Sequence, residues 1–458
     1  MHMKRVMVIS LSDDTVELQQ LARSMEYDVV SVHVQRRQAP NHTFYIGKGK
    51  VEELAPVVKT ERIDMVLFNH DLRPIQLFNL EKQLGCPVFD RTRLILEIFA
   101  DRAKDQEAKL QVELARLQYL VPYVKELVHR AKTGEHAGYM GGGEYQVDQY
   151  LKIIKKKIRD IKDRLGSIVV EREAKRRHRR EGGFFLISIA GYTNAGKSSL
   201  LANVTDAKPI IEERYFSTLY PSTRRGKKGV PGNQMLLFTD TVGFISGLPP
   251  AVIESFRSTV EEIYLSDLVL FIIDMTDTED EIVHKISTGL SYIRDGGGTS
   301  GILYVFNKID SVRGSDGNGD VSALKERLVN RLHSAGVDLS DHVLVSCTKK
   351  EGIDELMLSI IRTLLKLPHV HHLTIEGSRE AFTMAFNERL GQNLIGWLFS
   401  NTMVFKFNIP WDDGYPSASG NPTTNGSFEI LCKEKEFRKL MDINLNQDGK
   451  LSITDYKK

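Results

Sequence analysis

Hydrophobic positions near the start of the chain form short apolar runs separated by amphipathic segments. Compact apolar runs are typical of strands, whereas apolar residues three or four positions apart are typical of helices. The strand-like runs cover residues 6–10, 27–34, 65–68 and 87–89, and the helix-like segments cover residues 15–25 and 75–84. This alternation predicts a small N-terminal α/β domain, residues 1–105.

Within this domain, Gly47-Lys48-Gly49-Lys50 is expected to form a loop, because two glycines alternate with two lysines. Backbone N–H groups and ammonium groups in such a loop can bind phosphate. A solvated turn explains the same four residues equally well.

From residue 110 the apolar spacing changes to alternating steps of four and three, which is typical of packed helices with a heptad seam. The seam positions are Leu110, Leu114, Leu117, Val121, Val124 and Val128, then Val147, Leu151, Ile154, Ile158, Ile161, Leu165 and Ile168. Residues 129–146 between them are rich in glycine. The pattern predicts an antiparallel helical hairpin with a glycine-rich tip, residues 106–182.

After residue 183, strand-like runs again alternate with helix-like segments, and each run ends in a polar motif. This order predicts a mostly parallel sheet over residues 183–368. The remaining residues, 369–458, are expected to form a small C-terminal α+β region, with helix plus strand at 381–399 and a loop at 411–425. The chain is therefore predicted to be an α/β multidomain protein.

The strand-like run at 184–190 is followed by a glycine loop and a helix-like segment. The pattern G-x-x-x-x-G-K-[ST] in this setting is typical of a phosphate-binding P-loop, because its backbone N–H groups and the helix N-terminus both face the anion. Lys197 would reach the β- and γ-phosphates, and the hydroxyl of Ser198 would bind Mg²⁺. The loop expected to contact nucleotide is Gly191, Tyr192, Thr193, Asn194, Ala195, Gly196, Lys197 and Ser198.

Three later motifs indicate which nucleotide binds. Asp240 ends a strand, where a metal-facing carboxylate belongs. Asp310 follows another strand, where its carboxylate can accept from N1–H and N2–H₂ of guanine, and the Lys308 stem can cover the ring face. The backbone after a third strand would bond the base carbonyl. The motifs are Asp240-Thr241-Val242-Gly243, Asn307-Lys308-Ile309-Asp310 and Ser346-Cys347-Thr348. Together they indicate a GTPase that binds GTP and GDP.

Further motifs give the chain a family resemblance. They are Phe216-Ser217-Thr218-Leu219 with Pro221, Asp240 to Ile245 with Leu248-Pro249, Phe256-Arg257-Ser258-Thr259 with Glu261-Glu262, Tyr45 to Lys50 with Glu52-Glu53-Leu54, Asp90-Arg91-Thr92, and residues 108–122. Over about residues 1–368 the chain resembles the HflX family of translation-associated GTPases, which bind the ribosome.

The resemblance implies that Thr218 binds Mg²⁺ together with Ser198 and Asp240, with Thr223 as the alternative. It also implies nucleotide contacts from the segment Phe216, Ser217, Thr218, Leu219 and Tyr220, although Tyr220 stands where the family often has an acidic residue. We expect Lys197, Thr218 and Gly243 to be the catalytic residues.

Phe244 stands where many GTPases carry a glutamine that orients the attacking water. A phenyl ring neither donates nor accepts a hydrogen bond, so intrinsic hydrolysis should be slow. Asn194 matches a position where some related GTPases hold K⁺, which makes K⁺ a second expected cofactor. The alternatives are that Phe244 is a core residue and that Asn194 only shapes the loop.

The net charge of +2 predicts no partner, but its distribution is uneven. Residues 151–180 hold 13 Lys or Arg against 4 Asp or Glu. Such a helix can contact a phosphate backbone, although a solvated face explains it too. The resemblance implies that the hairpin and its tip insert into ribosomal RNA. The tip departs from the family, which commonly has Arg and Pro among the glycines; here it is Gly141-Gly142-Gly143-Glu144-Tyr145.

Composition and cysteine spacing indicate the cellular compartment of the protein. No apolar run is long enough to span a bilayer, and Cys86, Cys347 and Cys432 have no paired spacing, so a reducing, cytoplasmic location is expected. Residues 444–455 have the spacing of an EF-hand calcium loop, but they start with Asn444 and end with Asp455, and a polar turn is favoured over Ca²⁺ binding.

The sequence therefore predicts a Mg²⁺-dependent, monomeric GTPase that acts as a nucleotide-controlled factor on the ribosome, at the large subunit and its rRNA. The alternative is an RNA-binding ribosome assembly factor whose GTP site is mainly structural. A P-loop ATPase or kinase is disfavoured by the motif that ends at Asp310.

Overall fold

The computed structural model describes residues 3–132, 143–206, 222–227, 235–241, 243–244, 257–295, 301–313, 320–337, 339, 341–377, 394–408, 426–446 and 451–456. The chain separates into two compact units. The first holds residues 1–171 with 212–220 and 247–258, and the second holds the rest. The finer boundaries expected at residues 105, 182 and 368 stay predictions.

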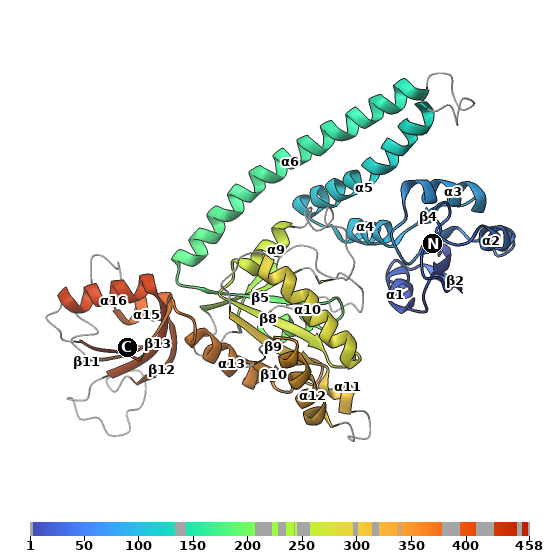
Figure 1. Cartoon of the computed structure of the whole chain (residues 1–458). Helices are drawn as coiled ribbons and strands as arrows, with labels where there is room; N and C mark the ends of the chain where they lie inside the picture. Colours follow the sequence, from blue (N-terminus) through green and yellow to red (C-terminus); the bar gives the residue numbers. More distant parts are fainter. Residues whose placement is uncertain are drawn as a thin grey trace. The chain divides into compact units, whose positions relative to one another are not determined.

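The first unit begins with a four-stranded parallel sheet in the order β2-β1-β3-β4 (Figure 1). Its elements are β1 (Arg5–Ser10), α1 (Val16–Ser24), β2 (Asp28–Val34), α2 (Lys48–Thr60), β3 (Met65–Phe68), α3 (Pro74–Leu84), β4 (Val88–Phe89) and α4 (Arg91–Arg102). The four strands and the helices α1 and α3 agree with the sequence prediction to within a few residues.

The prediction of a loop at residues 47–50 is wrong. Gly47 is the N-cap of α2, with φ −66° and ψ 145°, and Lys48 is the first helical residue. The helix begins there because Val51, Leu54 and Val58, at helical spacing, are buried against the sheet. Lys48 and Lys50 are paired along the helix with glutamates, so these lysines do not form a phosphate loop.

The α/β domain is joined to the hairpin helix α5 (Gln106–Lys132) through the buried carboxylate of Asp90. Asp90 accepts hydrogen bonds from the backbone N–H of Leu72 (3.1 Å) and Arg93 (2.8 Å), and from the hydroxyl of Tyr119 on α5 (2.9 Å). Burial raises the pKa of Asp90 to about 6 despite these three donors.

Helix α6 (Gly143–Glu181) packs against α5 along the predicted seams. Leu110 and Leu114 of α5 lie in one cluster with Ile161 of α6, and Lys157 pairs with Glu113 at 2.5 Å. The helical hairpin is therefore confirmed where its helices are described, whereas the tip at residues 133–142 lies outside the described residues.

The second unit contains a six-stranded sheet in the order β10-β9-β8-β5-β7-β6, parallel except for the edge strand β6. The strands are β5 (Phe185–Gly191), β6 (Ser222–Arg225), β7 (Leu236–Asp240), β8 (Leu268–Asp274), β9 (Gly301–Asn307) and β10 (His342–Leu344). The helices are α7 (Lys197–Val204), α9 (Arg257–Tyr264), which crosses the division between the units, α10 (Glu279–Asp295), α11 (Ile309–Arg313), α12 (Val321–Ser334) and α13 (Ile353–Leu365).

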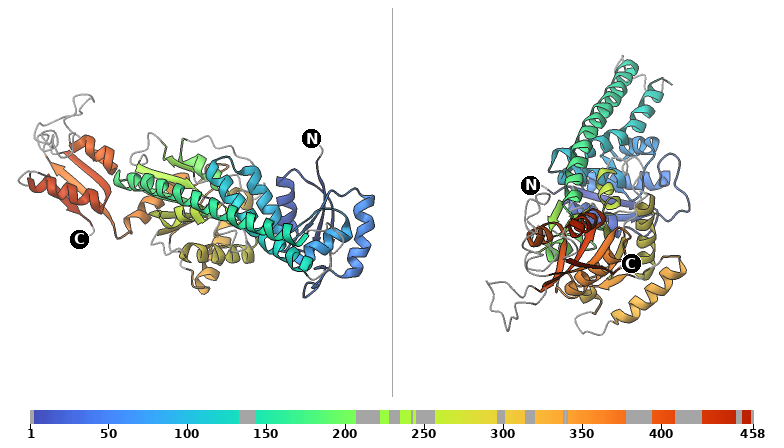
Figure 2. Two further views of the ribbon diagram at one scale, coloured as in Figure 1. Left: turned by 90° about the horizontal axis from the view of Figure 1, so that it is seen from above. Right: turned by 90° about the vertical axis from the view of Figure 1, so that its left-hand side faces the viewer.

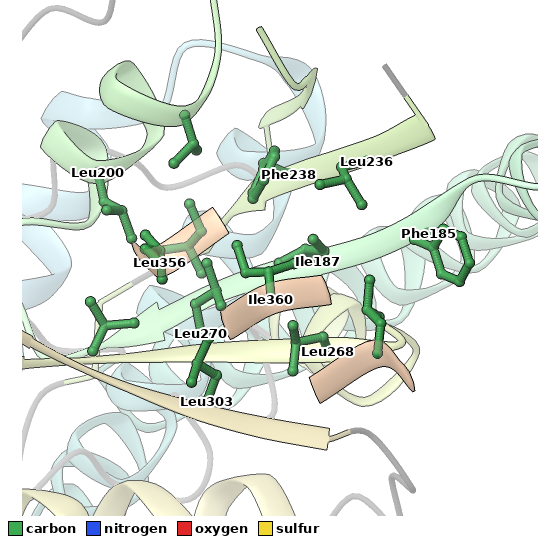
Figure 3. Packing of buried hydrophobic residues seen from close by; sticks show 14 of the residues in the cluster. Phe185, Ile187, Leu200, Leu236, Phe238, Leu268, Leu270, Leu303, Leu356 and Ile360 are labelled. Atoms are coloured by element: carbon green, nitrogen blue, oxygen red, sulfur yellow. The ribbon is translucent and has the colours of Figure 1, made fainter. Parts of the chain in front are cut away.

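Both faces of this sheet are covered, which is why its strands are almost continuously apolar. Helices α7 and α13 pack on one face, and α10 and α12 pack on the other. Figure 3 shows the first layer, where Leu356 and Ile360 of α13 meet side chains of β5, β8 and β9, including Ile187. The mostly parallel sheet predicted for this region is confirmed.

The C-terminal residues form an antiparallel sheet in the order β12-β13-β11-β14. Its elements are β11 (Val370–Gly377), α15 (Leu394–Asn401), β12 (Met403–Asn408), β13 (Gly426–Lys433), α16 (Glu434–Asn446) and β14 (Leu451–Asp455). Both helices pack on the same face of the sheet (Figures 1 and 2). Among the described elements the order is βαββαβ, the ferredoxin-like split βαβ arrangement, which is more specific than the α+β region that the sequence predicts.

The calcium-loop spacing at residues 444–455 does not form an EF-hand loop among the described residues. Asn444 and Asn446 lie in the helix α16, and Ser452 and Asp455 lie in β14. Asp455 contacts the ring Nδ1 of His371 at 3.0 Å. The expected loop at 411–425 and most of 381–393 lie outside the described residues, while 394–401 is helical.

Asp267, just before β8, joins the C-terminal sheet to the parallel sheet. Its Oδ2 accepts from the backbone N–H of Leu186 and from Lys433 Nζ on β13, both at 2.7 Å, and His369 Nε2 lies 3.3 Å from Oδ1. Burial alone would raise the pKa of Asp267, but these partners outweigh it and the pKa lies below its ordinary value. The side chains of Lys433 and Asp267 are only 13% and 12% exposed, so this hydrogen-bonded ion pair is largely shielded from water, and loss of one partner is costly in such an arrangement.

None of the described helices is long and apolar enough to cross a membrane.

Replacing Asp267 by Asn should lower the free energy of unfolding by about 3 kcal/mol at pH 7, because the Lys433 ammonium loses its counterion in a buried position. Since the folded pKa of Asp267 is lowered, its stabilisation is present above about pH 4 and disappears as the pH falls through the folded pKa. Urea unfolding of both proteins from pH 7 down to about pH 2 should therefore show free energies of unfolding that begin to converge below about pH 4.

The matched control is Asp341→Asn, which breaks a more exposed pair with Lys366 in the same unit and should cost less than about 1 kcal/mol. If Asp267→Asn and Asp341→Asn lower the free energy of unfolding equally at pH 7, Asp267 does not stabilise the junction of the two sheets in the way described.

Candidate nucleotide site

The residues that the sequence selects gather at one edge of the parallel sheet. The P-loop follows β5, Asp240 is the last residue of β7, Asn307 is the last residue of β9, and Ser346 follows β10. These strands run parallel, so their carboxyl ends lie at the same edge. In open α/β sheets this edge is where ligands bind.

The P-loop is shaped by one close approach. Gly196 has φ +100°, a conformation that side chains rarely adopt, and a Cβ there would clash with Asn307 Nδ2. Asn194 has φ +64°, which asparagine tolerates better than most residues. Helix α7 begins at Lys197, so its first turn faces the loop. This is the strand–loop–helix geometry that presents backbone N–H groups to phosphate.

Lys197 lies inside the loop. Its Nζ donates to the carbonyl of Gly191 at 3.1 Å and to the carbonyl of Tyr192 at 2.7 Å. Burial lowers the pKa of Lys197 to about 8, and nearby Asp240 opposes that shift. The ammonium is therefore poorly solvated in this state, and phosphate oxygens would be stronger partners than two carbonyls.

Two of the residues predicted to bind Mg²⁺ lie together. The hydroxyl of Ser198 donates to Asp240 Oδ2 at 3.0 Å, and Asp240 is 1% exposed. A hydroxyl and a carboxylate beside a phosphate site are hard oxygen donors of the kind that Mg²⁺ uses, so the donor set fits that ion. Thr223, the alternative to Thr218, lies in β6 with its hydroxyl 3.0 Å from that of Thr239.

Residues 216–220 and Val242 lie outside the described residues.

On the base side, Asp310 is held at the start of α11. Its Oδ1 accepts from the hydroxyl of Ser346 at 2.7 Å, and that hydroxyl accepts from the backbone N–H of Lys349 at 3.1 Å. The backbone of Ser346 is itself paired in both directions with Glu351. The carboxylate predicted to read guanine is therefore fixed by its neighbours before any base is bound.

Asn307 has a role that the sequence prediction did not specify. Its Nδ2 donates to the carbonyl of Ala195 in the P-loop at 2.8 Å, and its Oδ1 accepts from the N–H of Cys347 at 3.1 Å. Asn203 of α7 donates to the carbonyl of Cys347 at 2.8 Å. The backbone N–H of Cys347 is thus bound to Asn307 and its carbonyl to Asn203, so the backbone of Cys347 connects the loop after β10 to the loop after β9 and to α7. Burial raises the pKa of its thiol to about 12, so it stays protonated.

Phe244 is a core residue here. It is 8% exposed, and its ring lies 6.1 Å from the rings of both Tyr192 and Phe271. Its backbone N–H donates to the carbonyl of Gly191, and its carbonyl accepts from the N–H of Thr193. The ring thus faces the protein interior, and its backbone fixes the adjoining Gly243 beside the P-loop.

Gly243 is in close contact with the loop. A Cβ at this position would lie 2.7 Å from Lys197 Nζ and 2.7 Å from Thr193 Cγ2. Only a residue without a side chain leaves this space free, so the backbone of Gly243 can face the same volume as the lysine ammonium.

Sequence reasoning missed Asn203 and Asp274. Asp274 ends β8, and its Oδ2 accepts from Lys308 Nζ at 2.6 Å. The signal that selected Asp240, a carboxylate after an apolar strand, would also have selected Asp274. Asn203 carries no such signal, since it lies within a helix.

Comparison with known proteins found matches over most of the chain. Three family models match the chain: GTP-binding GTPase N-terminal over residues 12–100, GTP-binding GTPase Middle Region over residues 102–179, and 50S ribosome-binding GTPase over residues 186–308. A solved structure described as "crystal structure of SsGBP and GDP complex" is 27% identical with a TM-score of 0.49, over 80% of this chain and 100% of that chain.

Curated relatives also match over most of the chain. GTPase HflX of Thermococcus kodakarensis is 42% identical over 355 residues, which is 77% of this chain and 78% of the relative. GTPase HflX of Thermofilum pendens is 35% identical over 82% of this chain and 84% of the relative. With this identity over most of both chains, and with the P-loop and guanine motifs placed at one sheet edge, the chain belongs to the HflX family of GTPases and hydrolyses GTP.

Proposed function

We propose that the chain is a Mg²⁺-dependent GTPase that binds the large ribosomal subunit and is controlled by its nucleotide. The observation that carries the proposal is the pair of hydrogen bonds by which Asn307 joins the phosphate loop to Cys347. The neighbouring Ser346 donates to Asp310, and Ser198, at the end of the phosphate loop, donates to Asp240. The family description of a 50S ribosome-binding GTPase over residues 186–308 supports the choice of partner. Splitting, rescue and assembly of ribosomes are all compatible with this activity.

In the proposed mechanism, the triphosphate replaces the carbonyls of Gly191 and Tyr192 as the partner of Lys197. Ser198 and Asp240 would hold Mg²⁺, with Thr218 as a third ligand, and the ion would supply positive charge beside the phosphates. The backbone N–H of Gly243 donates to the γ-phosphate. Water attacks the γ-phosphorus, the bond to the β–γ bridging oxygen breaks, and GDP and phosphate leave.

The side chain at position 244 cannot orient the water, because the ring of Phe244 is apolar and is packed in the core. Slow hydrolysis by the free protein follows, and the ribosome supplies or orders what is missing. The alternative function, an assembly factor with a mainly structural GTP site, differs in that turnover would stay slow on the ribosome.

The surface proposed to contact rRNA is the exposed side of α6. Lys152, Lys155, Lys156 and Arg159 are exposed there, and Arg177 is exposed farther along the helix. Their side chains extend from a long helix with few acidic residues, the form that tracks a phosphate backbone. Salt should therefore weaken ribosome binding.

Changing Lys152, Lys155, Lys156 and Arg159 to Gln should weaken binding to purified large subunits and flatten its dependence on salt, because fewer counterions are released. Sedimentation with separated subunits, in GDP and in a non-hydrolysable GTP analogue, measures both the binding and its nucleotide dependence. We expect wild-type binding to large subunits with the analogue. The slope of log affinity against log salt should fall by roughly one for each phosphate that the variant no longer neutralises.

The control changes Arg327, Arg362, Lys366 and Arg438 to Gln, which removes the same charge from exposed positions of the second unit. An equal loss in this control would mean that net charge, and not the face of α6, determines binding. Binding to small subunits instead, or binding that ignores the nucleotide, would overturn the proposed partner.

Asp310→Asn should weaken GDP binding roughly 100-fold or more, because the carboxylate accepts two hydrogen bonds from guanine and an amide must present a donor. Xanthosine diphosphate, which carries a carbonyl in place of the N2 amine, should bind the variant better than it binds the wild type. Calorimetry with both nucleotides measures this exchange. Asp442→Asn, at an exposed position of α16, is the control. Unchanged GDP affinity in Asp310→Asn would remove Asp310 from the base site.

Asn194 is the proposed ligand for K⁺, which would stabilise charge between the β- and γ-phosphates. Because Asn194 has φ +64°, Asn194→Gly removes the side chain without straining the loop. Hydrolysis by the wild type should be roughly tenfold or more faster in K⁺ than in Na⁺ at equal ionic strength. Asn194→Gly should show equal rates in both salts while it still binds GTP. Equal wild-type rates in the two salts would leave Asn194 with a loop-shaping role alone.

A further inference from the structure

Asp274 stands at the end of β8, beside the end of β9, where it is directly paired with Asn307. Its Oδ1 accepts from the backbone N–H of Thr276 at 3.0 Å and from the Thr276 hydroxyl at 2.7 Å. Its Oδ2 accepts from Lys308 Nζ at 2.6 Å. The contacts of Oδ1 with Thr276 thus fix the orientation of the carboxylate, and Oδ2 binds the Lys308 ammonium.

Lys308 lies between two residues whose positions are already set. Asn307 faces the P-loop and Asp310 faces Ser346, and Lys308 joins them with φ +65°. A lysine in this left-handed region is strained, so the surrounding contacts must hold it there. The backbone fixes where the Lys308 stem starts, and Asp274 fixes where it ends.

A free lysine side chain samples many rotamers, and holding it in one of them costs conformational entropy. In this protein Lys308 Nζ is already bound to a carboxylate whose side chain is only 13% exposed. The entropy of ordering the stem is therefore lost on folding and not on nucleotide binding. A preordered apolar stem next to Asp310 offers a flat surface for a purine ring.

We propose that Asp274 is a positioning residue for the guanine base, which it serves by holding the Lys308 stem across the ring face. This inference rests on the proposed base site at Asp310. It adds a residue from β8 to a site otherwise built from the loops after β5, β7, β9 and β10. Asp274 itself makes no contact with the nucleotide in this role.

The sharpest variant is Asp274→Asn. An asparagine keeps the oxygen that accepts from Thr276, so the turn after β8 is retained. Its Nδ2 is a donor and faces the Lys308 ammonium, which is also a donor, so the two groups no longer bind each other. Lys308→Met is the partner variant, because methionine keeps an apolar stem but has no ammonium for Asp274 to hold.

The test is a double-mutant cycle on GDP affinity, measured by calorimetry with the full chain. Asp274→Asn should weaken GDP binding about 5–30-fold in the wild-type background. In the Lys308→Met background the same change should alter affinity less than about twofold, because the interaction through which it acts is gone. Asp280→Asn, an exposed acid on α10 that pairs with Arg331, is the matched control and should leave GDP affinity unchanged.

Equal weakening in both backgrounds would overturn the inference, since Asp274 would then act through the turn and not through Lys308. Unchanged affinity in Asp274→Asn would overturn it as well. Inosine diphosphate separates this role from that of Asp310. Asp274→Asn should weaken IDP and GDP by the same factor, because covering the ring face does not involve the N2 amine.

The outcome for Asp310→Asn shows which claim has failed. If that variant exchanges guanine for xanthine while Asp274→Asn has no effect, the base site stands and the positioning role is wrong. If Asp310→Asn leaves GDP affinity unchanged, the base site itself is misplaced.

Discussion

The nucleotide site depends on the side-chain amide of Asn307. It donates to the carbonyl of Ala195 and accepts from the N–H of Cys347, so one residue joins the phosphate loop to the loop beside the base. An aspartate could not donate and a leucine could do neither, whereas an amide has both functions. The same contact explains Gly196, since a Cβ there would clash with Asn307 Nδ2. The positions of Lys197, Ser198 and Asp310 follow from loops held in this way.

At the same edge of the sheet, Phe244 occupies the position where many GTPases carry a glutamine that orients the attacking water. Phe244 packs between Tyr192 and Phe271, and its backbone is paired with the P-loop. This packing stabilises the loop and leaves no polar side chain at that position for catalysis. The slow intrinsic hydrolysis and the dependence on a partner that we propose both rest on this packing of Phe244.

The sequence predicted where the candidate site residues lie because each of them follows an apolar strand, and parallel strands bring such ends together. Asp240, Asn307 and Ser346 are found by this rule, and Asp274 obeys it too although it was not selected. Partners across the fold, such as Asn203 with Cys347 and Asp267 with Lys433, have no local signal because long-range packing creates them. Likewise, residues 48–50 at the start of helix α2 were expected to lie in a loop because the glycines and lysines of residues 47–50 outweighed the helical apolar pattern that follows, and the C-terminal strand order became visible only through non-local pairing.

The central claim is that one guanine-nucleotide site hydrolyses GTP slowly alone and rapidly on the large ribosomal subunit. Steady-state phosphate release, measured with no subunits, with small subunits and with large subunits, tests it most directly. We expect a low rate for the protein alone, the same rate with small subunits, and stimulation of roughly 100-fold or more by large subunits. An equally low rate in all three mixtures would rule out ribosome-stimulated hydrolysis and favour a structural GTP site.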